Sequence, residues 1–217
     1  MTTYIQATKN DLKQVAKLMA IAFSDYPFMS HSFFTHNFKT KKEKLVFLEK
    51  MCFVYAKAMF ANVKIFISTS KQEFTGVAIF SKIEKMEISS LDLIRGGLIP
   101  LLPQLCKKHA TSFISAFLRE GAVLDNKYMK ANVWYLHIFA TSPAYRGKQV
   151  GTRLMADMLR FIQAQQGESL VTSTNTEMAL NFYVKNGFEL MEHEQLILHG
   201  ADKIDKFIIG RKLEVTS

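Results

Sequence analysis

The stretch Ser142-Pro-Ala-Tyr-Arg-Gly-Lys-Gln-Val-Gly-Thr152 decides the interpretation of this chain, because it lies between two segments of different periodicity. The preceding run, Trp134–Thr141, is aromatic and β-branched, which predicts a buried strand. The following run has apolar residues at helical spacing, namely Leu154, Met155, Met158, Leu159 and Ile162. The stretch is therefore a basic loop that leads from a strand into a helix N-terminus. Such an arrangement binds anions through unpaired amides and the helix dipole.

The residues of this loop suit a ligand that carries phosphate. Gly147 and Gly151 let the backbone approach a ligand, and Arg146 and Lys148 supply charge for phosphate oxygens. The loop is not a Walker loop, because Lys148 precedes the second glycine instead of following it. The glycine spacing of a dinucleotide-binding fingerprint is also absent.

The segment Arg146-Gly147-Lys148-Gln149-Val150-Gly151 resembles the pyrophosphate loop of the GCN5-related N-acetyltransferases (GNAT superfamily). The usual family pattern is Arg/Gln-x-x-Gly-x-Gly/Ala at the start of a long helix. The chain matches the first and last positions, but Gln149 stands where the family has its first glycine. If that position requires a positive φ, the side chain costs about 1 kcal/mol.

A second segment supports the same resemblance. Thr172-Ser-Thr-Asn175 is followed by Ala179-Leu-Asn-Phe-Tyr-Val-Lys-Asn-Gly-Phe188. The family commonly has a strand, a polar turn and a helix here, with a pattern that this chain matches at Ala179, Phe182, Tyr183, Gly187 and Phe188. Gly187 is placed to end the helix as its C′ residue. The resemblance covers Ala131–Lys212 by sequence, and the rest of the chain only by the order of its elements.

The expected fold is an α/β (α+β) domain spanning residues 1–217, with a mixed, bent central sheet of about six to seven strands flanked by helices. The earlier elements are a strand at Tyr4–Ala7, a helix with its apolar face from Leu12 to Phe23, a loop at Ser30–Phe38, a helix at Lys42–Phe60 and a hairpin of Val63–Thr69 with Phe74–Lys82. The last strands are Glu189–Leu198 and Lys203–Lys212.

A helical insertion at about residues 84–130 is expected between the third and fourth strands. Gly96-Gly97, Pro100 and Pro103 divide it into candidate helices at Ser89–Arg95, Leu101–His109, Thr111–Glu120 and Asp125–Met129. Such an insert either covers the acceptor site or only packs against the sheet.

The resemblance implies direct transfer of an acetyl group from acetyl-CoA to a primary amine, in a ternary complex. Backbone amides of the loop would hold the pyrophosphate, and the pantetheine arm would pair with the edge of the fourth strand. Asn175 would bind the pantetheine or cap the following helix. The cofactor-binding residues implied are Phe139, Ala140, Thr141, Arg146, Gly147, Lys148, Gln149, Val150, Gly151, Thr152 and Asn175.

Tyr183 is the candidate general acid, because the family has a tyrosine near the CoA sulfur at this position. A phenol with a pKa near 10 can protonate a leaving thiolate. The alternative is that Tyr183 is a core aromatic of an amphipathic helix. The general base is a separate question, because the fourth strand contains no acid.

His137 is the candidate base, expected on one strand face with Tyr135 and Phe139. A structural role for His137 is the alternative, and His31, His36, Glu120 or water are rival proton acceptors.

Composition fits a globular acetyl-CoA enzyme. The net charge of +9 suits the phosphates of CoA, and the scattered lysines come with no nucleic-acid-binding motif. Cys52 and Cys106 form no disulfide framework or zinc spacing and are expected to be buried, so no metal is expected. With no signal peptide pattern and no membrane-length apolar run, we expect a cytoplasmic protein without a membrane partner.

The predicted function is therefore acetyl-CoA-dependent N-acetyltransfer to a small-molecule amine. Protein N-termini or lysines are the other acceptors considered, and a homodimer is the default oligomer. The alternative function is a CoA-binding or acyl-CoA-binding module that keeps the GNAT fold without acetyltransferase activity.

Overall fold

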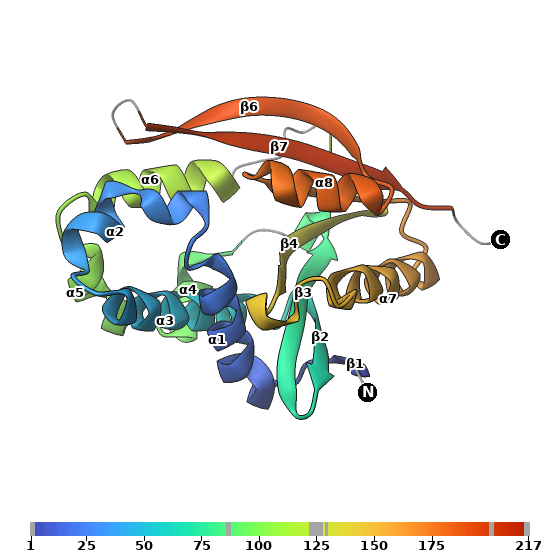
Figure 1. The fold of residues 1–217 in the computed structure, drawn as a ribbon, viewed down its shortest axis with the longest axis horizontal. Helices are drawn as coiled ribbons and strands as arrows, with labels where there is room; N and C mark the ends of the chain where they lie inside the picture. Colours follow the sequence, from blue (N-terminus) through green and yellow to red (C-terminus); the bar gives the residue numbers. More distant parts are fainter. Residues whose placement is uncertain (1–2, 86–87, 122–127, 129, 200–201, 215–217) are drawn as a thin grey trace.

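The computed structural model describes residues 3–85, 88–121, 128, 130–199 and 202–214 (Figure 1). Its centre is a seven-stranded sheet in the order β1-β2-β3-β4-β5-β7-β6, in which only β4 and β5 pair in parallel. The strands are β1 (Thr3–Gln6), β2 (Lys64–Ser70), β3 (Glu73–Lys82), β4 (Val133–Thr141), β5 (Ser169–Thr174), β6 (Glu189–His199) and β7 (Asp202–Lys212). The predicted mixed sheet is therefore confirmed.

Helices cover both faces of this sheet. The α-helices are α1 (Leu12–Phe23), α2 (Ser32–Asn37), α3 (Lys41–Met59), α4 (Ser90–Gly96), α5 (Leu102–Leu105), α6 (Ala110–Gly121), α7 (Val150–Ala164) and α8 (Glu177–Lys185). Short 3-10 turns occur at η1 (Lys9–Asp11), η2 (Pro27–Ser30), η3 (Ile83–Lys85), η4 (Ile99–Leu101) and η5 (Pro143–Tyr145). Among the described residues, none of the helices combines the length and apolar character that a membrane crossing requires.

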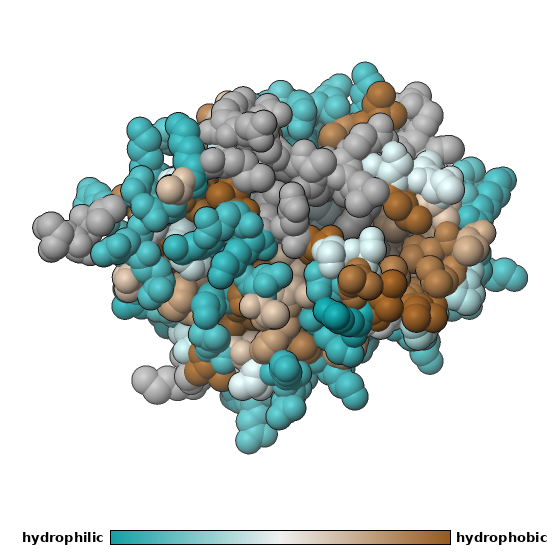
Figure 2. Space-filling view, turned by 180° about the vertical axis from the view of Figure 1, so that it is seen from behind, coloured by the Kyte–Doolittle hydropathy of each residue, from teal (hydrophilic) through white to brown (hydrophobic). Residues whose placement is uncertain are grey.

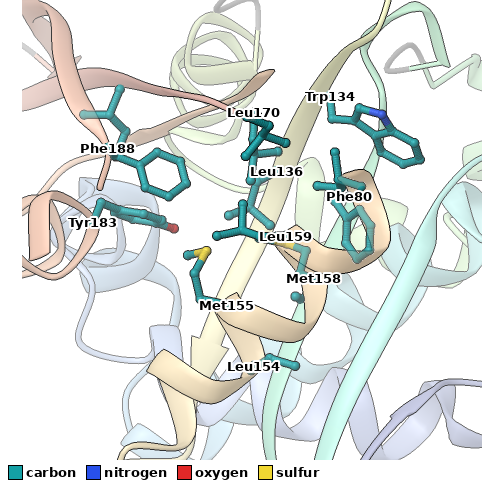
Figure 3. Close-up of a cluster of buried hydrophobic side chains, with 14 of the residues drawn as sticks. Phe80, Trp134, Leu136, Leu154, Met155, Met158, Leu159, Leu170, Tyr183 and Phe188 are labelled. Atoms are coloured by element: carbon teal, nitrogen blue, oxygen red, sulfur yellow. The ribbon is translucent and has the colours of Figure 1, made fainter. Parts of the chain in front are cut away.

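Alternation along the central strands sends side chains into two different cores. One core joins α7 and α8 to the sheet through Phe80, Trp134, Leu136 and their neighbours (Figure 3). The other joins α1 and α3 to the opposite face, through residues such as Val15, Met59 and Ile79. We call these the α7 face and the α1 face of the sheet.

The expected loop at Ser30–Phe38 is wrong, because most of it is helical. The His31 Nδ1 accepts a hydrogen bond of 3.0 Å from the Phe33 amide and so caps α2. Phe33 and Phe34 are buried, and the Phe33 ring stacks on Phe113 of α6 at 4.8 Å. Histidine is not among the usual capping residues, so the sequence did not indicate that His31 caps α2. The contact between Phe33 and Phe113 could not be predicted either, because the two residues are distant in sequence.

The predicted insert helices are only partly as expected. Among the described residues between β3 and β4, the α-helices are α4, α5 and α6, but α5 has four residues and ends at Leu105 instead of continuing to His109. Cys106 consequently falls in the turn after α5 and is exposed, so the expectation that both cysteines are buried is wrong for Cys106. The fourth candidate, Asp125–Met129, lies almost wholly outside the described residues.

Candidate active site

The basic loop ends in two left-handed residues immediately before α7. Gly147 has φ of 76° and Gln149 has φ of 59° with ψ of 12°. The amides of the first turn of α7 have no intrahelical acceptor, and the helix dipole places partial positive charge there. The amides at this end of α7 are therefore suited to bind a phosphate group.

Gln149 occupies the position at which the family has glycine, and its backbone shows why glycine is common there. A non-glycine residue in the left-handed region costs on the order of 1 kcal/mol. The Gln149 side chain is exposed, so glutamine in place of glycine raises the energy of this backbone conformation but does not disturb the packing of the core. The chain therefore retains the turn that a glycine would adopt with less strain.

The two cations of the loop are exposed, and one of them is positioned by its neighbours. The Lys148 Nζ lies 4.8 Å from the centre of the Tyr145 ring, in a cation–π contact. The Tyr145 hydroxyl in turn donates a hydrogen bond of 3.2 Å to the Glu73 carboxylate at the start of β3. Arg146 and Lys148 are thus exposed beside the candidate anion site, with Tyr145 next to Lys148.

Gly151 allows close packing of α7 against α8. A Cβ at this position would meet the Phe182 ring at 3.2 Å, which is tighter than an ordinary van der Waals contact. The Phe182 ring stacks on Phe139 of β4, with centroids 5.5 Å apart. The last glycine of the loop therefore lets the N-terminus of α7 pack directly against α8 and β4.

The β4 and β5 strands separate beside this loop. They pair only over three residues of each strand, Val133–Tyr135 with Ser169–Val171. Just beyond the pairing, the Thr172 hydroxyl donates a hydrogen bond of 2.8 Å to the Leu136 carbonyl. From there on β4 continues to Thr141 paired with β3 but not with β5. The backbone edge of residues 139–141 therefore faces the opening between the strands, where the resemblance places the pantetheine arm.

Tyr183 lies on α8 next to the opening, and its side chain is buried. Burial raises the pKa of Tyr183 above its ordinary value, the nearby Tyr26 raises it further, and a hydrogen bond with Thr172 lowers it. Figure 3 shows the Tyr183 hydroxyl directed toward Met155 and Leu159 of α7. Because Thr172 also bonds the Leu136 carbonyl, Tyr183 is linked to the point where β4 and β5 part.

The end of α8 has the geometry that the sequence predicts. The Phe188 amide donates to the Tyr183 carbonyl at 3.1 Å, and the Gly187 amide donates to the Val184 carbonyl at 3.0 Å. With Gly187 at φ of 81°, this is a Schellman ending. It fixes the turn of the helix that carries Tyr183.

Asn175 does not cap α8, so that alternative is wrong. The Thr176 side chain is the cap and accepts from the Ala179 amide at 3.2 Å. The Asn175 side chain is buried and donates to the Asp205 carbonyl at 2.8 Å, which ties the end of β5 to β7. Its proposed contact with pantetheine stays a prediction.

His137 occupies a β-bulge, which changes the faces expected for β4. The register with β3 passes from Leu136 to Ile138, so His137 is the extra residue. As a result Phe139 turns to the α7 face with Phe182, and the expectation that His137 and Phe139 share a face is wrong. His137 remains beside Tyr135, with ring centroids 4.9 Å apart.

The surroundings of His137 favour its neutral form. Its Nε2 lies 2.9 Å from the Ser81 hydroxyl. Burial lowers the pKa of His137 to about 3, which makes it a weak proton acceptor before substrates bind. The rival residues differ in environment: His31 caps α2 in the core, and the exposed His36 has its ring 4.7 Å from that of His109. The side chain of Glu120 lies outside the described part of the chain.

Sequence reasoning missed several polar residues near this opening. The Tyr26 hydroxyl accepts a hydrogen bond of 2.8 Å from the backbone amide of Asn175 and lies 3.3 Å from the Thr174 hydroxyl. Tyr26 therefore joins the segment between α1 and α2 to the end of β5. On the β6–β7 hairpin, Tyr128 hydrogen-bonds Glu192, and buried Lys206 pairs with Glu194 at 3.3 Å. These partners are far apart in sequence, and only the alternation of charge along β6 could have indicated them.

Comparisons with known proteins agree with this geometry. Residues 113–190 match the model of the acetyltransferase (GNAT) domain. No protein of curated function matches the sequence. Many solved structures share the fold at low sequence identity, which makes them informative about architecture alone.

Three of these structures illustrate the match. A histone acetyltransferase HPA2 and related acetyltransferase from Corynebacterium glutamicum has 17% identity, a TM-score of 0.64 and coverage of 100% of this chain and 98% of that one. The Escherichia coli ribosomal-protein-S18-alanine N-acetyltransferase has 12% identity, a TM-score of 0.58 and coverage of 100% and 97%. The PaiA N-acetyltransferase from Thermoplasma acidophilum, in complex with coenzyme A, has 11% identity, a TM-score of 0.53 and coverage of 98% and 99%.

Residues 113–190 thus match an acetyltransferase (GNAT) domain, and the whole chain shares its fold with solved acetyltransferase structures. The sequence match covers about a third of the chain, and the structural likeness concerns the fold alone. The predicted resemblance is confirmed.

Proposed function

We propose that this protein transfers the acetyl group of acetyl-CoA to a primary amine of a small molecule. The observation that carries the proposal is the separation of β4 from β5 directly beside the anion-binding start of α7. One end of a CoA molecule needs amides and cations for its pyrophosphate, and its pantetheine needs a free strand edge. The chain offers both next to each other, with Tyr183 buried where they meet.

In the proposed reaction the neutral amine attacks the thioester carbonyl carbon within a ternary complex. An amide of residues 139–141 polarises the carbonyl oxygen. The tetrahedral intermediate then loses the thiolate, which takes a proton from Tyr183, while the amide nitrogen of the product loses its proton to a base or to water. Because the pKa of Tyr183 is raised, the phenol remains protonated at neutral pH and ready to donate.

A small acceptor is supported by the surroundings of the α1 face. Tyr128 of the insert packs against Tyr135 of β4, and α6 lies against β6. These segments cover the side of the sheet from which an acceptor would approach the opening. The proposal keeps the whole chain as one cytoplasmic catalytic domain without nucleic acid or metal.

A CoA-binding module without transferase activity is the second candidate. The observation in its favour is the environment of His137, which keeps the only histidine of β4 neutral and weakly basic, while the strand offers no carboxylate. In this case the loop and the opening between β4 and β5 would bind CoA, but no side chain near the opening would deprotonate an ammonium group.

Calorimetric titration with acetyl-CoA, and with CoA that lacks the 3′-phosphate, tests the shared part of both candidates. We expect saturable micromolar binding of acetyl-CoA. A panel of primary amines, assayed for thiol release with mass detection of the acetylated product, then separates the two. Product formation supports the transferase, and binding without product from small amines, peptides or lysine-bearing proteins supports the module. Absence of acetyl-CoA binding contradicts both.

A further inference from the structure

The helical insert carries a cluster of large apolar side chains on its outer surface. Leu91 and Ile94 of α4 are 62% and 46% exposed, Ile99 of η4 is 59% exposed, and Leu102 of α5 is 45% exposed. We call these four residues the insert patch. Figure 2 shows apolar residues gathered on the side where α4 and α5 lie when the molecule is seen from behind.

The residues of the insert patch are distinct from those that pack the insert onto the core. The same segment has a second apolar row, including Leu93, Leu98 and Leu101, which packs inward on the cluster around Phe33 and Phe113. Gly96 brings α4 so close to α3 that a Cβ there would meet the Val54 carbonyl oxygen at 2.7 Å. The segment therefore has two sets of apolar residues, one packed on the core and one exposed. An exposed apolar cluster of this kind marks a contact surface.

The charges within the segment that carries the insert patch are mostly positive. Between Ser89 and His109 the only acidic residue is Asp92, whose carboxylate is used in the capping box of α4 with Ser89. The cations Arg95, Lys107 and Lys108 of the same segment are exposed. The chain as a whole carries +9. A partner that accepts this surface must bury apolar side chains and tolerate or attract positive charge at the same time.

We propose that the insert patch docks the protein on the surface of an anionic lipid bilayer, with the apolar side chains at the boundary between headgroups and acyl chains. Apolar residues next to lysine and arginine are the composition of interfacial membrane contacts. Each cation near such a surface strengthens binding roughly fivefold. A second copy of this chain would bring like charges together, so the charge pattern favours lipid over self-association. The proposal departs from the expectation that the protein has no membrane partner.

Co-sedimentation with lipid vesicles tests the proposal on the full chain. We expect binding to vesicles containing about one third phosphatidylglycerol, little binding to pure phosphatidylcholine, and loss of binding as salt rises. Leu91→Ser with Ile99→Ser should weaken binding about tenfold or more. The matched control is Met178→Ser with Val184→Ser on α8, where the exposed fractions are 69% and 50%. The control should bind like the unaltered protein.

Charge variants separate the electrostatic part of the contact. Arg95→Gln with Lys107→Gln and Lys108→Gln should lower binding to anionic vesicles by roughly a hundredfold and flatten the salt dependence. The same number of charges removed at the exposed Lys13, Lys17 and Lys185 should have a much smaller effect. Equal effects of the two triple variants would mean that net charge alone attracts the protein, and would overturn the assignment to the insert.

A fluorescent probe tests the contact without removing apolar residues. Ile99→Trp should show a blue shift on anionic vesicles and quenching by brominated acyl chains, whereas Met178→Trp should show neither. The native Trp134 is buried and adds a constant background. No vesicle binding by the unaltered chain, or no quenching at position 99, overturns the proposal. If the unaltered chain also sediments as a dimer that the Leu91→Ser and Ile99→Ser double variant loses, the patch binds a second copy instead.

Discussion

The two faces of the central sheet are built in different ways. On the α7 face, the site is made of backbone: two left-handed residues before α7, a glycine that lets α8 approach, and an unpaired edge of β4. On the α1 face, the candidate site is made of side chains from distant segments. Tyr26 hydrogen-bonds the end of β5, and Tyr128 hydrogen-bonds the β6–β7 hairpin. Backbone geometry of the first kind suits the proposed CoA ligand, whereas side chains of the second kind could vary with the proposed acceptor.

The largest effect on the site built from backbone is expected from a negative charge at the start of α7. Gly151→Asp adds a side chain against Phe182 and a negative charge where the pyrophosphate is proposed to bind. We expect the Kd for acetyl-CoA to rise at least a hundredfold, about 2.7 kcal/mol. Calorimetry measures this effect. Ala156→Asp, at an exposed position of the same helix, should leave the Kd nearly unchanged, and an equal loss in both variants would contradict the placement of the site.

Tyr183→Phe tests the residue buried next to the opening between β4 and β5. Because the hydroxyl is proposed to protonate the leaving thiolate, we expect kcat to fall at least about a hundredfold with little change in the KM for acetyl-CoA. The raised pKa means that Tyr183 itself should produce no alkaline decrease in rate below pH 10. Steady-state rates from pH 6 to 10 check both points. Unchanged kcat would instead make Tyr183 a core aromatic.

His137, on the face built from side chains, should make the folding stability depend on pH. Its folded pKa of about 3 lies below the ordinary value of 6.5, so the unfolded chain binds the proton more readily. The associated stability is present above about pH 6.5 and is lost as the pH falls toward 3, by up to about 1.4 kcal/mol per pH unit. His137→Gln should flatten this loss in urea unfolding at pH 7.5, 6 and 5.

The control for His137→Gln is His36→Gln, which changes an exposed histidine of α2. In this control, the loss of folding stability at low pH should persist. A loss that is equally steep without His137 would show that other groups cause it. If His137→Gln also removes more than nine tenths of kcat at neutral pH, the histidine acts as the base despite its low pKa.

The smallest expected effect concerns the strained residue of the backbone-built side. Gln149 and Gln166 both have φ of 59°, at opposite ends of α7. Valine at either position should destabilise the fold by about 1–2 kcal/mol, whereas glycine should change stability by less than about 1 kcal/mol. Thermal unfolding measures both. Only Gln149→Gly should tighten acetyl-CoA binding, and the same gain at position 166 would contradict a role of position 149 in the loop.

The sequence predicted the parts of the site that depend on local rules. A basic loop between a strand and an amphipathic helix, and a glycine placed to end α8, require no knowledge of distant residues. Gly187 and Phe188 form the Schellman ending in the structure, and Gln149 adopts the left-handed backbone for which the family uses glycine. The bulge at His137 was not readable, because it depends on the register between β3 and β4.

By itself, therefore, the sequence determined the order of the strands and of the longer helices, the basic loop before α7 and the helix of Tyr183, because periodicity and turn chemistry act within a few residues. The tertiary structure alone decided where β4 and β5 part, which face each residue of β4 occupies, and which partners meet Tyr26, Asn175 and Lys206. It also decided that one apolar row of the insert stays outside. These features depend on register and on contacts between distant segments, for which one sequence carries no local signal.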